Sequence, residues 1–222
     1  MFDFSLSRLL FLVPAIIIAL TFHEYAHARV AYAFGDPTAR DAGRLTLNPL
    51  RHLDVLGTLL LIVAGFGWAK PVPVNPWLMG ENRRKKLMAV SAAGPVMNLL
   101  EALAGAGIMS LIVHLAPATN GFYYYALVFL SYFVMINVVL AVFNLIPIPP
   151  LDGSKILGGL LPESKLHVEL ALERYGFGIL MLLIFLPEIL SLLGLPGIDI
   201  LGTIISKPAQ WLIQAIYSLF GI

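Results

Sequence analysis

The chain has no cysteine and little charge. With no cysteine in 222 residues, a disulfide framework, a thiolate metal site and a cysteine nucleophile are all excluded. Charged residues make up only 12% of the chain, against roughly 25% in ordinary soluble domains, and the net charge is +1. This balance gives no electrostatic basis for binding nucleic acid, and we expect no nucleic-acid partner.

What the chain has instead is long apolar sequence. Hydrophobic residues make up 59% of it, and several apolar runs reach the ~20 residues that a bilayer-spanning helix needs. The sequence therefore predicts an all-α polytopic membrane protein with about five transmembrane helices, in a single domain over residues 1–222. The predicted core spans cover about 9–34, 88–115 and 122–153, and C-terminal helices cover about 176–221.

One further apolar segment, residues 53–67, is too short to be a span. As a helix its 15 residues reach about 22 Å, less than a ~30 Å hydrocarbon core. The loops on both sides of it, 36–52 and 68–86, contain Lys and Arg residues, as does the loop 147–175, and loops enriched in Lys and Arg lie in the cytosol. We therefore expect a re-entrant or membrane-dipping segment, an N-terminus outside the cytosol, and a location in the plasma membrane of a prokaryote.

The most informative motif lies inside the first apolar run. Residues 23–27 read His-Glu-Tyr-Ala-His, an H-E-x-x-H pattern. On a helix, His23 and His27 lie on one face, within reach of one metal ion, and Glu24 is placed to act as general base on a metal-bound water. The pattern also arises by chance in soluble helices, but ionisable groups within a spanning segment are costly and indicate function. Counting along the helix puts His23 within roughly 10 Å of the cytosolic face.

A second motif follows a later span. It reads Asn-Leu-Ile-Pro-Ile-Pro-Pro-Leu-Asp-Gly over residues 144–153. Its prolines end the helix and force extended backbone, which is tolerated at membrane depth only where protein or water satisfies it. Asp152 then lies at a depth similar to that of His27 and completes a His₂-Asp site with an open position for water. Alone, the Asp-Gly pair would also suit an ordinary interfacial turn.

Together the two motifs resemble the site-2 protease family of intramembrane zinc metalloproteases (peptidase family M50). The intervening segment Ser-Ala-Ala-Gly-Pro-Val-Met-Asn at 91–98 also resembles the G-x-x-x-N segment of that family. The resemblance covers residues 9–34 and 88–153, and the combination of motifs is specific although each piece alone is not.

The resemblance implies a site and an activity. His23, His27 and Asp152 would bind zinc, one ion per chain because only one complete ligand set is visible. Glu24 would be the catalytic acid/base, and Asn144 would help to hold the substrate or the reacting carbonyl. For Asn144, hydrogen bonding between helices is an equally good interpretation. The activity implied is hydrolysis of peptide bonds within or next to the transmembrane segments of membrane-anchored proteins.

Two other classes of protein stay open. A membrane metal-ion transporter would also need intramembrane histidines and carboxylates, but usually has several sites along a path and often repeated halves. A catalytically idle relative that only binds substrates would not need Glu24. The sequence leaves the substrate and the oligomeric state undetermined.

Further polar residues in the spans are candidates for supporting roles. Gly94 and Asn98 lie one turn apart after two alanines, so packing is the simplest role for Gly94, while Asn98 is a candidate for orienting a ligand or contacting substrate. Glu101, one turn further on, suits a fourth ligand, a proton relay or a neutral packing residue. Asn137 is similarly ambiguous.

Two loop features complete the expectations. His52 and Asp54 form an H-x-D pair, for which we favour a role in orienting segment 53–67 or in a bond to a metal ligand. Segments 44–48 and 72–75 alternate as short strands do, so small strands at the cytosolic interface could hold an extended substrate. Ordinary interfacial loops are the alternative, because the prolines limit pairing.

Overall fold

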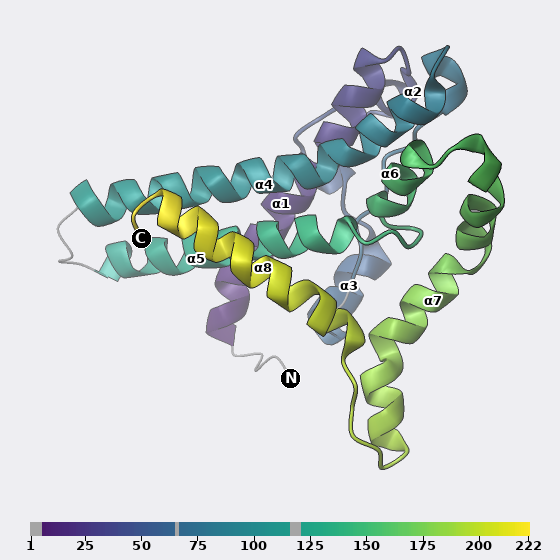
Figure 1. The fold of residues 1–222 in the computed structure, drawn as a ribbon. Helices are drawn as coiled ribbons and strands as arrows, with labels where there is room; N and C mark the ends of the chain where they lie inside the picture. Colours follow the sequence, from purple (N-terminus) through teal and green to yellow (C-terminus); the bar gives the residue numbers. More distant parts are fainter. Residues whose placement is uncertain (1–5, 65–66, 116–120) are drawn as a thin grey trace.

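The computed structural model describes residues 6–64, 67–115 and 121–222 as helices joined by short loops (Figure 1). In chain order the elements are α1 (Leu6–Ala33), α2 (Thr38–Asp41), η1 (Pro49–Arg51), α3 (Val55–Ala64), η2 (Pro76–Met79), α4 (Arg83–Leu115), α5 (Gly121–Asn144), α6 (Asp152–Leu160), η3 (Glu163–Lys165), α7 (Leu166–Leu192) and α8 (Ile200–Leu219).

Four of the described helices are long and apolar enough to cross a membrane, namely α1, α4, α5 and α7. This confirms the prediction of an all-α polytopic membrane protein. The C-terminal helix α8 does not meet the same measure, so the count of five spans stays a prediction. Helix α3 has ten residues and is about 15 Å long, which agrees with a segment that cannot cross a ~30 Å core.

The helix boundaries differ from the expected ones near the second motif. Helix α5 ends at Asn144, and Asp152 begins the separate helix α6 rather than ending a span. Helix α7 begins at Leu166, ten residues before the expected 176. Both starts are concealed in the sequence, because α6 has only nine residues and the first turns of α7 carry Glu169, Glu173 and Arg174, so that 147–175 resembles a polar loop in composition.

The prediction of short strands at 44–48 and 72–75 is wrong. Within the described residues, pairing of this kind is limited to one antiparallel bridge between Leu53 and Ala69. Pro71 and Pro73 have no N–H to donate, and the N–H groups of Val72 and Asn75 bond to carboxylate side chains rather than to another strand.

The centre of the molecule is built on α4, which packs against α1, α5 and α6 (Figure 1). Small side chains line these contacts: Ala102 and Ala106 of α4 are fully buried against Val134 and Val138 of α5, and Ala209 of α8 joins the same cluster. Because lipid tails are as apolar as the side chains, helix association in a membrane depends on close packing, which small residues allow.

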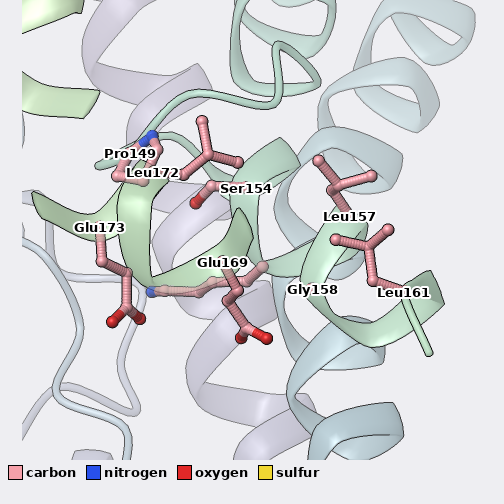
Figure 2. A pocket seen from close by; sticks show the side chains of 9 residues that line it. Pro149, Ser154, Leu157, Gly158, Leu161, Glu169, Leu172 and Glu173 are labelled. Carbon is pink, nitrogen blue, oxygen red and sulfur yellow. The ribbon is translucent and has the colours of Figure 1, made fainter. Parts of the chain in front are cut away.

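Helix α6 lies between α4 and α7. Arg84 Nη2, near the start of α4, donates to the carbonyl oxygen of Gly158 (2.6 Å) and to Glu169 Oε2 of α7 (2.9 Å). Figure 2 shows Glu169 and Leu172 of α7 beside α6. These side chains help to line a cavity of about 20 Å³, which has room for a single water.

An extended segment, residues 70–75, connects the loops around the end of α1; we call it the strap. The backbone N–H of Lys70 donates to the carbonyl of His52 (2.8 Å), and Arg44 Nη2 donates to the Lys70 carbonyl. At the other end, the N–H of Asn75 donates to Asp36 Oδ2 (2.7 Å). Buried polar side chains, rather than pairing with another strand, therefore keep the strap in position.

Asp36 supports a direct test of this arrangement. The side chain is fully buried, and we expect Asp36→Ala to lower the free energy of unfolding by about 1–3 kcal/mol, because the Asn75 N–H loses its acceptor. The matched control is Asp41→Ala, whose exposed ion pair with Arg40 (2.8 Å) contributes little to stability because solvent screens it. Thermal unfolding of both variants in detergent measures the difference, and equal losses would contradict the role of Asp36.

Candidate metal centre

Three potential metal ligands from two distant parts of the chain converge. His23 and His27 lie one turn apart on α1, and Asp152 begins α6. Both histidines are buried. The Nε2 atoms of the histidines are 3.0 Å apart, and Asp152 Oδ2 lies 3.2 Å from that of His23 and 3.3 Å from that of His27. The predicted set is therefore brought together.

A chain of hydrogen bonds determines the tautomer of His23. Asn137 Nδ2 donates to the carbonyl oxygen of Phe133 (3.0 Å), which turns Asn137 Oδ1 toward Asn98, whose Nδ2 donates to it (2.8 Å). Asn98 Oδ1 then faces His23 Nδ1 at 2.6 Å. Because an amide oxygen only accepts, the ring proton of neutral His23 is on Nδ1, and Nε2 presents a lone pair.

His27 is oriented in the same way by the backbone. Its Nδ1 lies 2.7 Å from the carbonyl oxygen of Val90 in α4, which can only accept. The Nε2 of neutral His27 therefore also carries a lone pair. A bond of this kind from the second ring nitrogen is the usual way in which proteins orient metal-binding histidines.

The donor set fits a bound cation. Two nitrogen lone pairs and a carboxylate oxygen face one another at 3.0–3.3 Å, and acceptors at that separation repel unless a cation lies among them. Ligands placed at ~2.0–2.1 Å from one tetrahedral zinc ion would be about 3.3 Å apart. His₂-carboxylate is a ligand set of catalytic zinc sites, so the residues present fit zinc.

Two glycines allow the ligands to meet. A Cβ at Gly94 of α4 would collide with ring atoms of both His23 and His27, and one at Gly153 would collide with the backbone carbonyl oxygens of Leu145 and Ile146. The first glycine lets the α4 backbone lie directly against the imidazoles. The second lets the chain turn back on itself next to the carboxylate ligand.

Glu24 lies beside the ligands and is nearly buried, with 9% of its surface exposed. Its Oε2 accepts a hydrogen bond from the backbone N–H of Val72 in the strap (3.0 Å). Arg44, which holds the strap, is close enough for the two charges to interact: burial lowers the pKa of the Arg44 guanidinium, and the Glu24 carboxylate acts in the opposite direction. The strap therefore positions the carboxylate.

The other predicted site residues lie outside this cluster. Asn144 Nδ2 donates to the carbonyl of Leu140 in its own helix (3.0 Å). His52 is buried, and its Nε2 contacts the Thr46 carbonyl oxygen (2.7 Å). Asp54 Oδ1 accepts from the N–H of Gly57 (2.8 Å) at the start of α3. His52 thus bonds within its own loop, and Asp54 bonds to the start of α3, the segment that follows it.

Sequence reasoning does not single out Val72 or Val90, because both act through the backbone and their side chains give no signal. Asp36, which holds the strap, follows a glycine and precedes a proline, and in sequence this pattern indicates only a turn. The sequence marks Asn137 as a polar residue within a span but does not show what it bonds to. In the structure its hydrogen-bond partner is Asn98. Glu101 has a buried Oε2 with no hydrogen-bond partner among the described residues.

A spanning helix that carries two oriented histidines, with Asp152 of the short helix α6 facing them and a buried glutamate beside them, has the ligand set and the adjacent base of a metallohydrolase site. A family comparison agrees: residues 11–185 match the model of peptidase family M50. The chain belongs to peptidase family M50, the site-2 protease family.

Named relatives point the same way. The chain is 43% identical over 190 residues to YwhC of Bacillus subtilis, with 83% of this chain and 84% of that protein covered. It is 32% and 31% identical to the Rip2 proteins of Mycolicibacterium smegmatis and Mycobacterium tuberculosis, over 78% of this chain and 66% of theirs. All three carry provisional names as zinc metalloproteases. No solved structure matches.

The contact of Gly94 with both imidazoles gives a test of the centre. We expect Gly94→Ala to weaken zinc binding by roughly 10–100-fold, the range found when groups around metal ligands are disturbed, because the added methyl group pushes the rings apart. Gly178→Ala is the control, since a Cβ there meets no atom within 4 Å. Metal analysis after competition with a chelator measures the affinity, and undiminished zinc in Gly94→Ala would count against this geometry.

Proposed function

We propose that the protein is an intramembrane zinc endopeptidase that cleaves membrane-anchored proteins within or next to their transmembrane segments. The observation that carries the proposal is the position of the three converging ligands and Glu24 on and beside α1, a helix of membrane-spanning length and apolarity. Membership of family M50 supports peptidase chemistry, and the helical context supports a substrate that lies in the membrane.

In this proposal His23, His27 and Asp152 hold one zinc ion. When bound, zinc supplies Lewis acidity, which polarises the scissile carbonyl and lowers the pKa of a coordinated water toward ~7. Glu24 takes the proton of the attacking water on its carboxylate and passes it to the leaving amide nitrogen. The hydrogen bond from Val72 keeps the carboxylate in one orientation for both transfers.

Asn144 is proposed as a donor to the developing oxyanion. Its amide donates one hydrogen to the Leu140 carbonyl in this structure, and because the NH₂ group has two donors, the second hydrogen is the one proposed to reach the oxyanion. An Asn144 that only hydrogen-bonds within and between helices is the alternative.

The site is proposed to lie near the cytosolic face of a prokaryotic plasma membrane. The basis is the distribution of basic residues: the segments 36–52, 68–86 and 147–175 carry most of the chain's lysines and arginines, and Lys- and Arg-rich segments between spans are retained in the cytosol.

A metal-ion transporter is the second candidate, and the side chains favour it less. Among the described residues, one group of three or more potential metal ligands is found, whereas transport requires further sites along a path. Glu24 is buried next to the metal centre but is not one of the three ligands. This position suits proton transfer better than metal-ion transport.

The role of Glu24 separates these candidates. Glu24→Gln should retain zinc and lower the cleavage of a single-span substrate in proteoliposomes by roughly 10²–10⁴-fold, since the amide cannot accept the proton. Glu188→Gln, an exposed carboxylate on α7, is the control and should cleave normally. Normal cleavage by Glu24→Gln would exclude the proposed chemistry, and zinc flux into the liposomes would support a transporter.

The form of the substrate gives another prediction. The carbonyls of a spanning helix are engaged in i to i−4 hydrogen bonds, so attack requires local unwinding. A Leu→Gly change near the cut should speed cleavage by up to about fivefold, because Gly costs ~1 kcal/mol in a helix.

Mass spectrometry of the products locates the cut, which we expect in the cytosolic half of the substrate helix. The same Leu→Gly change in the opposite half is the control and should have no effect. Cleavage confined to that opposite half would contradict the proposed orientation.

A further inference from the structure

The outer side of the α1–α4 pair carries a groove that the metal centre does not use. Its volume is about 440 Å³, within the ~300–1,000 Å³ of small-molecule sites. Helix α1 contributes Tyr25, Ala26 and Arg29 to its lining, and α4 contributes small and apolar side chains that include Ala92 and Ala93. The groove is thus apolar apart from Arg29 and the Tyr25 hydroxyl.

Helix geometry places this groove behind the centre. Successive residues are about 100° apart around a helix, so His23 and His27 share one face of α1 while Tyr25 lies on the other. In α4, Gly94 lies against the imidazoles, and Ala92 lies on the opposite side in the groove. An occupant of the groove would therefore contact the helices that carry the site without entering the site.

Arg29 is the unusual residue of the lining. It is exposed, and within the described part of the chain it forms no hydrogen bond or ion pair. It lies four residues before the end of α1 at Ala33, a helix of spanning length. A cation at the end of a spanning helix reaches for the polar interface, and next to an apolar groove it favours an anion that belongs to an otherwise apolar molecule.

A second cation lies at the same end of the groove. Lys85 precedes the groove residue Ala89 by one turn and so shares its face of α4. The other three cations of the 83–86 cluster are engaged with a Trp ring, a carboxylate and a backbone carbonyl, whereas Lys85 has no such partner in the described structure. The end of α1 and the start of α4 meet in one buried cluster, which brings Arg29 and Lys85 to one end.

We propose that the groove binds an anionic phospholipid, with the phosphate between Arg29 and Lys85 and an acyl chain between α1 and α4. A protein helix is the less suitable occupant, because it would have to carry its own carboxylate toward the hydrocarbon to neutralise Arg29. A lipid brings its negative charge at the interface, where basic side chains are attracted to anionic headgroups. Lipid binding in this groove does not depend on whether the protein is a peptidase.

Competition between lipids tests this site. Wild-type protein and variants are equilibrated in detergent micelles with equal amounts of phosphatidylglycerol and phosphatidylcholine, and the retained lipid is measured by native mass spectrometry. Wild type should retain phosphatidylglycerol in preference. Arg29→Gln and Lys85→Gln should each lower this retention by roughly fivefold, Arg29→Lys should keep it, and Lys207→Gln on α8, an exposed cation outside the groove, is the control.

A second variant separates the groove from simple surface charge. Ala93→Trp fills the groove and leaves both cations in place, so it should also lose the retained lipid. Equal retention of both lipids by wild type would overturn the proposal. Unchanged lipid retention in both Arg29→Gln and Ala93→Trp would overturn it as well. The proposal would also be overturned if Ala93→Trp kept its bound lipid but no longer cleaved a helical substrate, because that result would assign the groove to a protein helix.

Discussion

The centre depends on the two hydrogen bonds that hold the Nδ1 atoms of its histidines. With both ring protons on Nδ1, the two Nε2 lone pairs and the Asp152 carboxylate face one another, and three buried acceptors at this separation favour a cation among them. For His23 the orientation passes through Asn98 and Asn137. A backbone carbonyl of α5 thus fixes the tautomer of a side chain on α1.

Close packing of helices is the second constraint, and glycine supplies it at three places. Gly94 brings the α4 backbone against the imidazoles, Gly153 closes the turn next to Asp152, and Gly176 of α7 lies against the ring of Pro149 in the same turn. A methyl group at any of the three would meet atoms of the site or of the turn that carries its third ligand. The same small residues that allow helices to associate in lipid therefore also set the ligand positions.

The sequence is sufficient to identify the metal ligands, but it does not identify the groups that orient them. His23, His27 and Asp152 can be found because ionisable groups at membrane depth are costly and rare unless they serve a function. Asn98 is a reasonable candidate on the same grounds. Val72 and Val90 cannot be found, because a backbone N–H or carbonyl is present at nearly every position. The strand prediction fails because strap N–H groups bond to two buried carboxylates, and pairing between distant polar groups is not visible in a local pattern.

The strap makes the polar loops part of the centre. Glu24 Oε2 already accepts the Val72 N–H, and its Oε1 accepts no hydrogen bond from the described residues, so Oε1 is the atom left to receive a proton. Proton transfer at a fixed atom requires a carboxylate that does not rotate. The strap provides this only while Asp36 and Arg44 hold its two ends. The loops therefore act on the chemistry by fixing which oxygen of Glu24 faces the reacting groups, although neither Asp36 nor Arg44 is among the metal ligands.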